Sequence, residues 1–390
     1  MTVKLYDTNP YETKFTAQVI SCEPAADRYA VVLDRTLFFP EEGGQTPDHG
    51  VLTYRNETII VADVQIRSDE IIHYCDKPVD ARSEVTGEID WARRFDNMQQ
   101  HTGEHIVSGL VHTLCGYNNV GFHLSEETVT MDYDGELSPE QIERIETLAN
   151  QAIWEDHTVT VRYPEPAELA ALDYRSKLDL TQGVRLVNID GIDLCACCAP
   201  HVSGTAQVGL LKIIDYRRYK GGMRLWVKCG GRALADYRTL HEQALAVSGE
   251  LSSPRESLAD PLRALKEELE SRKQAIGSLS ASLLTARIRE IPADQMNVVL
   301  FENDIDNDKA LRDAANELAA SRRGFCAVFF APDDTSWRYI CASTGSDCRT
   351  WNEELKKAFP VRGGGQAGMV RGSVTAGEDE LRAWFEILSV

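Results

Sequence analysis

Two pairs of metal-ligating residues, far apart in the sequence, constrain the fold of this chain most strongly. His101 and His105 stand four residues apart in His-Thr-Gly-Glu-His, within a segment of helical apolar periodicity. Residues at this spacing lie on one face of a helix, so both imidazoles can reach one ion. Taken alone the pair is a weak motif, because helices carry it by chance. Cys197 and His201 supply a second pair, and zinc suits the resulting three imidazoles and one thiolate.

Three interpretations of such a metal centre compete. A zincin-type protease needs glutamate directly after the first histidine, but this chain has Thr102 there and Glu104 one turn away, which excludes it. A structural site and a catalytic site both remain, since four protein ligands close the coordination sphere unless one is loose or a water joins them. Cys195 or Cys198 can also replace Cys197, although Cys197 gives the Cys-x-x-x-His spacing. We expect packing or supporting roles for those two cysteines.

The bulk composition is typical of globular proteins. With 390 residues the chain is long enough for two or three domains, and it has 43% hydrophobic and 26% charged residues. It has neither an apolar run of membrane-spanning length nor a secretory signal at its start, so we expect no membrane association and a cytoplasmic location. Three of the ten cysteines crowd into 195–198, which indicates metal chemistry in a reducing compartment. The net charge of −20 argues against a protein that simply coats nucleic acid.

The sequence pattern predicts an α+β chain of several domains. Residues 1–90 alternate short β-rich runs with turn signals, which predicts a small, closed or strongly bent β-domain. Residues 91–231 combine helical and β patterns and predict an α/β core around the candidate zinc site. Residues 232–292 predict a helical hairpin with coiled-coil character, with two ordinary amphipathic helices as the alternative. Residues 293–390 predict a C-terminal α/β domain with a glycine-rich loop at 363–365.

Several motifs, in a fixed order along the chain, resemble one family. They are Thr36 to Gln45 (TLFFPEEGGQ), Asn97 to His105 (NMQQHTGEH), Cys197 to Gly209, Gly221 to Arg224 and the glycines at 363–365. Together they resemble the long-form AlaX proteins, relatives of the editing and C-terminal (C-Ala-like) parts of alanyl-tRNA synthetase. The resemblance covers nearly the whole chain. One departure is Cys198-Ala199-Pro200, where the family usually has Gly-Gly-Thr.

The resemblance implies a zinc-dependent aminoacyl-tRNA deacylase, an ester hydrolase. It implies that His101, His105, Cys197 and His201 bind Zn²⁺ and that the segment ending in Gly-Gly-Gln shapes the aminoacyl pocket. Thr36 falls where the family carries a threonine associated with recognition of the serine hydroxyl. The implied substrate is alanine tRNA wrongly esterified with serine or glycine. Since the chain begins at the β-domain and shows no ATP-binding motif, we expect editing without aminoacylation.

Ester hydrolysis needs a delivered water and a stabilised oxyanion, and the sequence offers candidates for this work. Gln45 and His123 are candidates to position the water, although a lone histidine is more often structural. Gly43 and Gly44 permit positive φ and a close approach of the backbone to a ligand, with a plain hairpin turn as the alternative. For Thr36 the alternative to serine discrimination is an ordinary strand threonine.

Contact with tRNA requires local positive charge on this acidic chain. The segment 212–232 is rich in lysine and arginine, and it is the best candidate to contact the phosphates of the acceptor stem. Its candidate residues are Arg217, Arg218, Lys220 and Arg224, with a solvated strand face as the alternative.

The C-terminal glycines offer a second candidate contact. Arg362 precedes Gly363, Gly364 and Gly365, whose backbone N–H groups are candidates to cradle phosphate. The family implies that this C-terminal region binds tRNA and joins two chains into a homodimer. Two other functions stay open: a zinc-stabilised tRNA-binding module without activity, and a metal hydrolase of a small ester or amide that is indifferent to tRNA.

Overall fold

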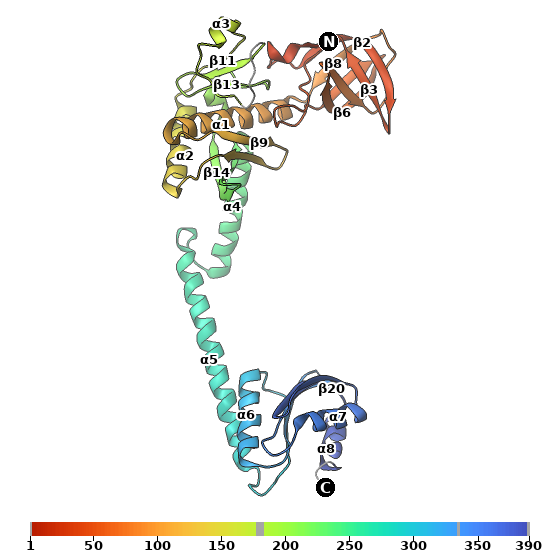
Figure 1. Ribbon diagram of the computed structural model, residues 1–390, viewed down its shortest axis with the longest axis vertical. Helices are drawn as coiled ribbons and strands as arrows, with labels where there is room; N and C mark the ends of the chain where they lie inside the picture. The colour runs from red at the N-terminus through yellow and green to blue at the C-terminus, as the bar shows by residue number, and fades with distance from the viewer. Residues whose placement is uncertain (1, 177–182, 334–335, 388–390) are drawn as a thin grey trace. The chain divides into compact units, whose positions relative to one another are not determined.

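The computed structural model describes residues 2–176, 183–333 and 336–387 of the chain. The chain divides into two compact units, Met1–Gln243 and Ala244–Val390, and the division falls inside helix α4 (Gly230–Leu251). Both units combine helices with β-sheets (Figure 1). The expected mixed α+β class with several domains is therefore confirmed.

The first part of the N-terminal unit is a closed β-barrel with strand order β2-β3-β7-β6-β5-β8. Its strands are β2 (Lys14–Ala25), β3 (Arg28–Leu33), β5 (Gly50–Tyr54), β6 (Glu57–Arg67), β7 (Glu70–Cys75) and β8 (Glu84–Ile89), and β1 (Val3–Lys4) pairs in parallel with β4 (Arg35–Thr36). In β8, buried and exposed residues alternate one by one, as expected where one strand face is turned to a core. Phe38 and Phe39, from the segment after β4, are fully buried in that core. Closure pairs every barrel strand on both sides, so no edge stays open.

Helix α1 (Trp91–Cys115) follows the barrel and carries the histidine pair. The side chain of Asp90 caps its first turn by accepting from the backbone N–H of Arg93, and Gly116 ends it with φ of 71°. Arg94 is fully buried; it pairs with Asp48 and donates to the carbonyl of Leu37. The start of α1 is thereby tied to the barrel.

Helix α1 lies between two antiparallel sheets, as Figure 1 shows. One sheet has the order β14-β15-β10-β9 and the other β11-β12-β13. The strands are β9 (Asn119–Leu124), β10 (Val129–Tyr133), β11 (Val159–Arg162), β12 (Leu186–Ile189), β13 (Asp193–Ala196), β14 (Leu211–Tyr219) and β15 (Gly222–Cys229). Helix α2 (Pro139–Trp154) packs on α1 and opens with a capping box between Ser138 and Gln141. The apolar core of this region surrounds α1, so the histidines lie in the interior.

The C-terminal unit contains one five-stranded sheet with the order β16-β17-β18-β20-β19. The strands are β16 (Val298–Glu302), β17 (Cys326–Asp333), β18 (Ser336–Ala342), β19 (Val361–Gln366) and β20 (Met369–Thr375). Helix α6 (Asp308–Ser321) and the last turns of α5 (Ala259–Glu290) share one apolar core with this sheet, while α7 (Cys348–Ala358) and α8 (Glu378–Ile387) share a second. The unit is thus a sheet with helices on both faces.

The seven-residue apolar pattern of the predicted helical hairpin lies on α5, and it is exposed. Its members are Leu262, Leu265, Leu269, Ile276, Leu279 and Leu283, each at least 42% exposed. Only the end of the helix, at Leu284 and Ile288, enters the core of the C-terminal unit. The antiparallel hairpin packed along this seam stays a prediction. A heptad pattern indicates that a helix face needs an apolar partner, but it does not identify that partner.

The C-terminal glycines do not form the predicted loop. Gly363, Gly364 and Gly365 belong to strand β19, which pairs with β20 at the edge of the sheet. A Cβ atom at Gly363 would lie 2.5 Å from the hydroxyl of Tyr339. The glycines therefore permit a close approach within the sheet, and ladder pairing uses part of the backbone N–H groups that a phosphate cradle would need.

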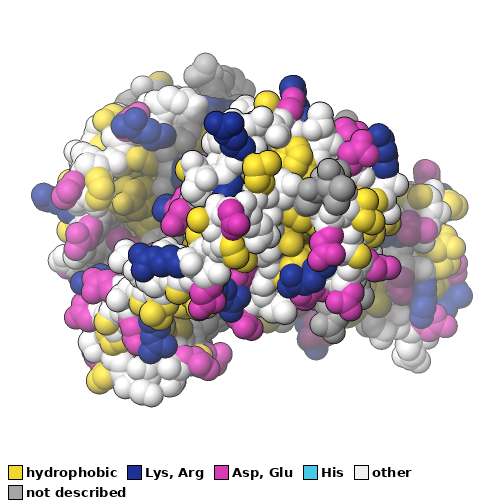
Figure 2. All heavy atoms as spheres, turned by 90° about the horizontal axis from the view of Figure 1, so that it is seen from below, with side chains coloured by type: hydrophobic (Ala, Val, Ile, Leu, Met, Phe, Trp, Pro, Cys, Tyr) yellow, Lys and Arg dark blue, Asp and Glu magenta, His cyan; other side chains and the backbone are white. Residues whose placement is uncertain are grey.

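The described helices include none that is both long and apolar enough to cross a membrane. On the face seen in Figure 2, lysine and arginine side chains lie interspersed with aspartate and glutamate. That face therefore carries no extended basic patch.

Candidate metal centre

Helix α1 brings His101 and His105 to one buried face, as their spacing predicts. Their exposed fractions are 3% and 1%. Cys197 and His201 come from the segment that follows β13, and Arg185 fixes this segment by donating to the carbonyl oxygens of Cys197 at 2.8 Å and of Ala199 at 2.9 Å. The loop that carries the second ligand pair is therefore held by a buried guanidinium.

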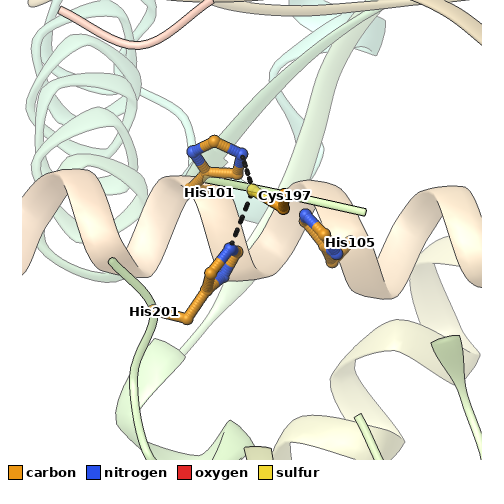
Figure 3. A group of neighbouring side chains, drawn as sticks. All are labelled: His101, His105, Cys197 and His201. Atoms are coloured by element: carbon orange, nitrogen blue, oxygen red, sulfur yellow. Dashed lines mark hydrogen bonds between the residues drawn. The ribbon is translucent and has the colours of Figure 1, made fainter. Parts of the chain in front are cut away.

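The four predicted ligands meet at one point. The Nε2 atoms of His101 and His201 lie 3.5 Å and 3.4 Å from Sγ of Cys197, and the four candidate ligand atoms all lie within 4.8 Å of one another. Figure 3 shows the sulfur between the imidazoles of His101 and His201, with His105 on the same helix as His101. Three imidazoles and one thiol around a common centre form a donor set that fits Zn²⁺.

Each imidazole is oriented by a partner on its other nitrogen. Nδ1 of His101 lies 2.8 Å from Oε1 of Gln45, and Nδ1 of His105 lies 2.9 Å from Oδ2 of Asp193. Nδ1 of His201 lies 3.1 Å from Oγ1 of Thr102. Outer partners of this kind fix the tautomer of a metal-bound histidine. Nε2 is then the nitrogen that each imidazole would offer to a metal ion.

Burial sets the protonation of the ligands. It is the main cause that lowers the pKa of His201 well below its usual value, with the neighbouring His105 and His101 adding to the effect. Burial likewise raises the pKa of the Cys197 thiol well above its usual value, and Cys198 raises it further. His201 therefore stays neutral and ready to bind a metal, whereas Cys197 must lose its proton to the solvent on binding.

The two neighbouring cysteines lie outside this tetrad. Cys195 groups instead with His105 and Asp193. Cys198 packs against the barrel core, and its Sγ would be 3.2 Å from a Cβ atom at Gly43. Cys197 is thus the cysteine that meets the three histidines, as its spacing to His201 predicts.

A cavity of about 430 Å³ opens beside the metal ligands. Its walls include Gly43, Glu104, Asn119, Phe122, Tyr163 and Arg185 together with His101, His105 and Cys197. The ring of Phe122 packs on His101 with centroids 4.7 Å apart. The volume lies within the usual range of small-molecule sites, and the cavity is lined by both apolar and charged side chains.

The glycine turn of the predicted pocket segment approaches this site closely. Gly43 and Gly44 have φ of 63° and 84°. A Cβ atom at Gly44 would lie 2.4 Å from the carbonyl oxygen of Phe122. The turn therefore needs glycine both for its backbone conformation and for its contact with β9.

The other predicted pocket residues lie elsewhere than at the cavity wall. Gln45 is fully buried, with its amide oxygen at His101. Thr36 is fully buried too, with Oγ1 2.8 Å from Nε2 of His73. His123 is an exposed residue of β9. Gln45 thus orients a metal ligand and Thr36 takes part in the barrel interior, while His123 does not line the cavity.

The predicted tRNA-binding residues of the hairpin β14–β15 are mostly paired with acids. The pairs are Arg217–Asp215, Arg218–Glu136 and Arg224–Asp132, and Lys220 lies over the ring of Tyr219. The side chains of Arg217 and Arg218 are 70% and 80% exposed, and such exposed pairs open at little cost. The guanidinium of Arg224 binds both carboxylate oxygens of Asp132 and is committed to that contact.

Several residues of the site have no signal of their own in the sequence. Asp193, Arg185 and Asn119 are single polar residues in β-rich segments, and tertiary packing alone brings them to the metal ligands. Glu104 was visible in the histidine motif, but no role for it could be inferred from the sequence once the protease interpretation was excluded.

Two family models match the chain. The model described as tRNA synthetases class II (A) matches residues 6–93, which contain the barrel. The model described as threonyl and alanyl tRNA synthetase second additional domain matches residues 184–225, which contain Cys197 and His201.

Relatives with related names cover much or nearly all of the chain. The alanyl-tRNA editing protein AlaX-L of Pyrococcus horikoshii is 33% identical over 60% of this chain and 60% of its own length. The alanyl-tRNA editing protein Aarsd1-B of Xenopus laevis is 26% identical over 97% of this chain and 95% of its own. An alanine–tRNA ligase of Ignicoccus hospitalis is 32% identical over 75% of this chain. The chain spans only 33% of that ligase, and 60% of AlaX-L.

Among solved structures, the C-Ala domain of Aquifex aeolicus alanyl-tRNA synthetase matches 24% of this chain and 89% of its own at 19% identity, with a TM-score of 0.20. The two family models thus relate the barrel and the segment that carries Cys197 and His201 to domains of tRNA synthetases. The resemblance to AlaX-type alanyl-tRNA editing proteins that the motifs predicted is confirmed, since relatives with these names match most of the chain.

Proposed function

We propose that this chain is a trans-editing hydrolase, which removes serine or glycine from mischarged alanine tRNA with the help of a zinc ion. The observation that carries the proposal is the meeting of His101, His105, Cys197 and His201, of which the first three line a cavity. The names of its relatives, which describe alanyl-tRNA editing proteins, give the substrate class.

The chain's own residues supply a closed setting for ester hydrolysis. A zinc ion held by the tetrad would polarise the acyl carbonyl or lower the pKa of a bound water. Phe122 shields one side of His101, and the turn at Gly43 brings backbone close to the ligand loop. Both features narrow the space around the candidate ligands.

The tRNA body needs contacts outside this cavity. We assign them to Arg217, Arg218 and Lys220 at the tip of the β14–β15 hairpin, because these cations are exposed and can exchange their present partners for phosphate. Arg362 on β19 is a further candidate in the C-terminal unit.

A homodimer through the C-terminal region is part of the proposal. Its support is the exposed heptad face of α5, since apolar residues repeated at this spacing match the seam of a coiled coil. None of the ten cysteines, all of which lie in the described residues, forms a disulfide, and a reducing, cytoplasmic location is part of the proposal.

The test is release of labelled serine from seryl-tRNA specific for alanine, with correctly charged alanyl-tRNA as control. We expect rapid serine release that a zinc chelator stops and added zinc restores, and little loss of alanine. Loss of serine that is unaffected by chelation would contradict the role of zinc. Equal cleavage of a small seryl ester without tRNA would favour a general ester hydrolase.

One observation favours a second candidate, a zinc-stabilised tRNA-binding protein without activity. All four ligands come from the protein, which is the usual arrangement of structural zinc sites. In that case chelation would unfold the N-terminal unit, and the chain would bind alanine tRNA without deacylating it.

A further inference from the structure

Glu104 lies at the metal centre, although it is not one of the four ligands. It stands on α1 directly before His105, is 4% exposed, and lines the cavity. A carboxylate is costly to bury unless hydrogen bonds or a cation stabilise it. The position of Glu104 therefore calls for an explanation.

One carboxylate oxygen of Glu104 is held firmly. Oε1 accepts a hydrogen bond from the hydroxyl of Ser108 and another from the side-chain amide of Asn119, both at 2.6 Å. Oε2 has a different environment and lies 3.6 Å from Nε2 of His105. The metal-facing nitrogen of a ligand and the second oxygen of Glu104 thus lie side by side.

The described residues provide no lysine or arginine in an ion pair with Glu104. The nearby guanidinium of Arg175 is taken by Asp193, with two contacts of 2.6 Å and 2.8 Å. A glutamine would accept equally well from Ser108 and Asn119, so the packing of α1 does not require the charge. The negative charge beside the cavity is therefore available to a bound cation.

We propose that Oε2 of Glu104 receives the α-ammonium group of the aminoacyl substrate; this inference rests on the proposed deacylase function. Every aminoacyl ester carries that ammonium group next to the scissile carbonyl. A zinc ion with one thiolate and three neutral imidazoles has a net positive charge, which would repel the ammonium group. Glu104 offsets this repulsion, and its fixed Oε1 holds Oε2 in one orientation. It thereby selects aminoacyl groups over other acyl groups and orients the carbonyl.

The test compares two hydrolysis-resistant compounds. One is the seryl amide of 3′-amino-3′-deoxyadenosine, and the other has a hydroxyl in place of the α-ammonium. Calorimetry should show that the zinc-loaded protein binds the ammonium compound at least tenfold more tightly. In Glu104→Gln the two affinities should differ by less than twofold, because the amide keeps both hydrogen bonds to Oε1 but presents an N–H₂ group to the cavity.

Ser108→Ala is the matched control, since it removes one partner of Oε1 and leaves the carboxylate in place; it should keep at least a fivefold preference. Zinc content should be unchanged in both variants. A tenfold preference that survives in Glu104→Gln overturns the inference, as does loss of zinc from that variant, which would make Glu104 a ligand. Equal affinities in the unaltered protein overturn it without any variant.

The seryl-tRNA assay separates this inference from the proposed function. If the unaltered protein deacylates seryl-tRNA but shows no preference for the ammonium compound, only the role of Glu104 fails. If it neither deacylates nor binds either compound, the proposed function fails and the role of Glu104 fails with it.

Discussion

The amide oxygen of Gln45 lies 2.8 Å from Nδ1 of His101, so a residue next to the barrel's glycine turn orients a metal ligand on α1. Gln45→Ala should weaken zinc binding about tenfold to a hundredfold, because His101 loses the acceptor that fixes its tautomer. Competition with a chromogenic chelator at neutral pH measures this loss. Gln65→Ala, which removes an amide bonded to Glu41 on the barrel, should leave the zinc affinity unchanged. Equal affinities of Gln45→Ala and the unaltered protein would contradict the assignment.

The contact between Gln45 and His101 also illustrates what the sequence can predict. The proximity of the candidate ligands His101 and His105 was predictable, because helical spacing places them together locally. The partners of these ligands were not, since Gln45 and Asp193 lie 56 and 88 residues from the histidines that they orient. Such contacts depend on how barrel, helix and sheet pack together, and one sequence carries no direct record of that packing.

For the same reason, the helices and strands were easier to predict than the residues that pack against them. The β-rich pattern of residues 1–90 predicted a closed or strongly bent β-domain, because alternation is local, and the structure shows a closed barrel. The heptad pattern of α5 was recognisable, but such a pattern does not identify the partner of its apolar face. The cations of the β14–β15 hairpin were recognisable as well, whereas their acidic partners at Asp132 and Glu136 come from a distant segment.

The buried ion pair between Arg94 and Asp48 should dominate the stability of the junction between α1 and the barrel. Both side chains have 0% exposure. Arg94→Met should destabilise the N-terminal unit by about 3–5 kcal/mol, because it leaves the carboxylate of Asp48 buried without a cation. Denaturant unfolding followed by near-ultraviolet circular dichroism measures the change.

Two comparisons make the Arg94 result specific. Adding Asp48→Asn to Arg94→Met should recover part of the loss, since the amide stays neutral and can still accept from the backbone N–H of Phe39. Lys14→Met, which breaks an exposed pair with Glu88, should change the stability by less than about 1 kcal/mol. If Arg94→Met lowers the free energy of unfolding no more than Lys14→Met does, the buried pair does not stabilise the junction between α1 and the barrel.

His73 should make the barrel less stable in mild acid. Burial lowers its pKa from 6.5 to about 4. The unfolded chain therefore binds more protons than the folded one between these pH values, and stability falls as the pH drops through this window and levels off below about pH 4. The difference between the two pKa values corresponds to roughly 3 kcal/mol. His73→Gln lacks this titration, so its unfolding free energy should fall less between pH 7 and pH 4.5. Parallel pH profiles of the two proteins would exclude this role.

Zinc binding should release about one proton per chain at neutral pH. Burial raises the pKa of Cys197 well above its usual value, so the thiol is protonated before the metal binds as thiolate. Zinc affinity should consequently rise about tenfold for each pH unit in this range. Calorimetric titration in two buffers of different ionisation enthalpy counts the protons. Cys197→Ser should release no proton on zinc binding and should bind zinc weakly. Cys195→Ser should keep both the proton release and the zinc affinity of the unaltered protein. Proton release that persists in Cys197→Ser would assign the ligand to another cysteine.

Thr36 offers the sharpest contrast between resemblance and structure. The resemblance assigns its hydroxyl to serine recognition, but Oγ1 lies 2.8 Å from Nε2 of His73 and accepts from the backbone N–H of Phe38 at 3.0 Å. Because Nδ1 of His73 contacts the carbonyl of Val31, Nε2 is the acceptor for the Thr36 hydroxyl. The donor position and one of the two acceptor positions of this hydroxyl are thus occupied inside the barrel.

Thr36→Val should therefore destabilise the barrel by about 1–3 kcal/mol, since it leaves two buried polar groups without partners. The ratio of seryl-tRNA to alanyl-tRNA deacylation should stay unchanged, because Thr36 does not line the cavity. Thr36→Ser keeps the hydroxyl and should restore most of the stability. Thermal unfolding and the two deacylation rates, measured on the same samples, separate the roles. If Thr36→Val lowered the ratio of seryl-tRNA to alanyl-tRNA deacylation at unchanged stability, Thr36 would have a role in substrate recognition. Its hydroxyl would then have to leave His73 when the aminoacyl group binds.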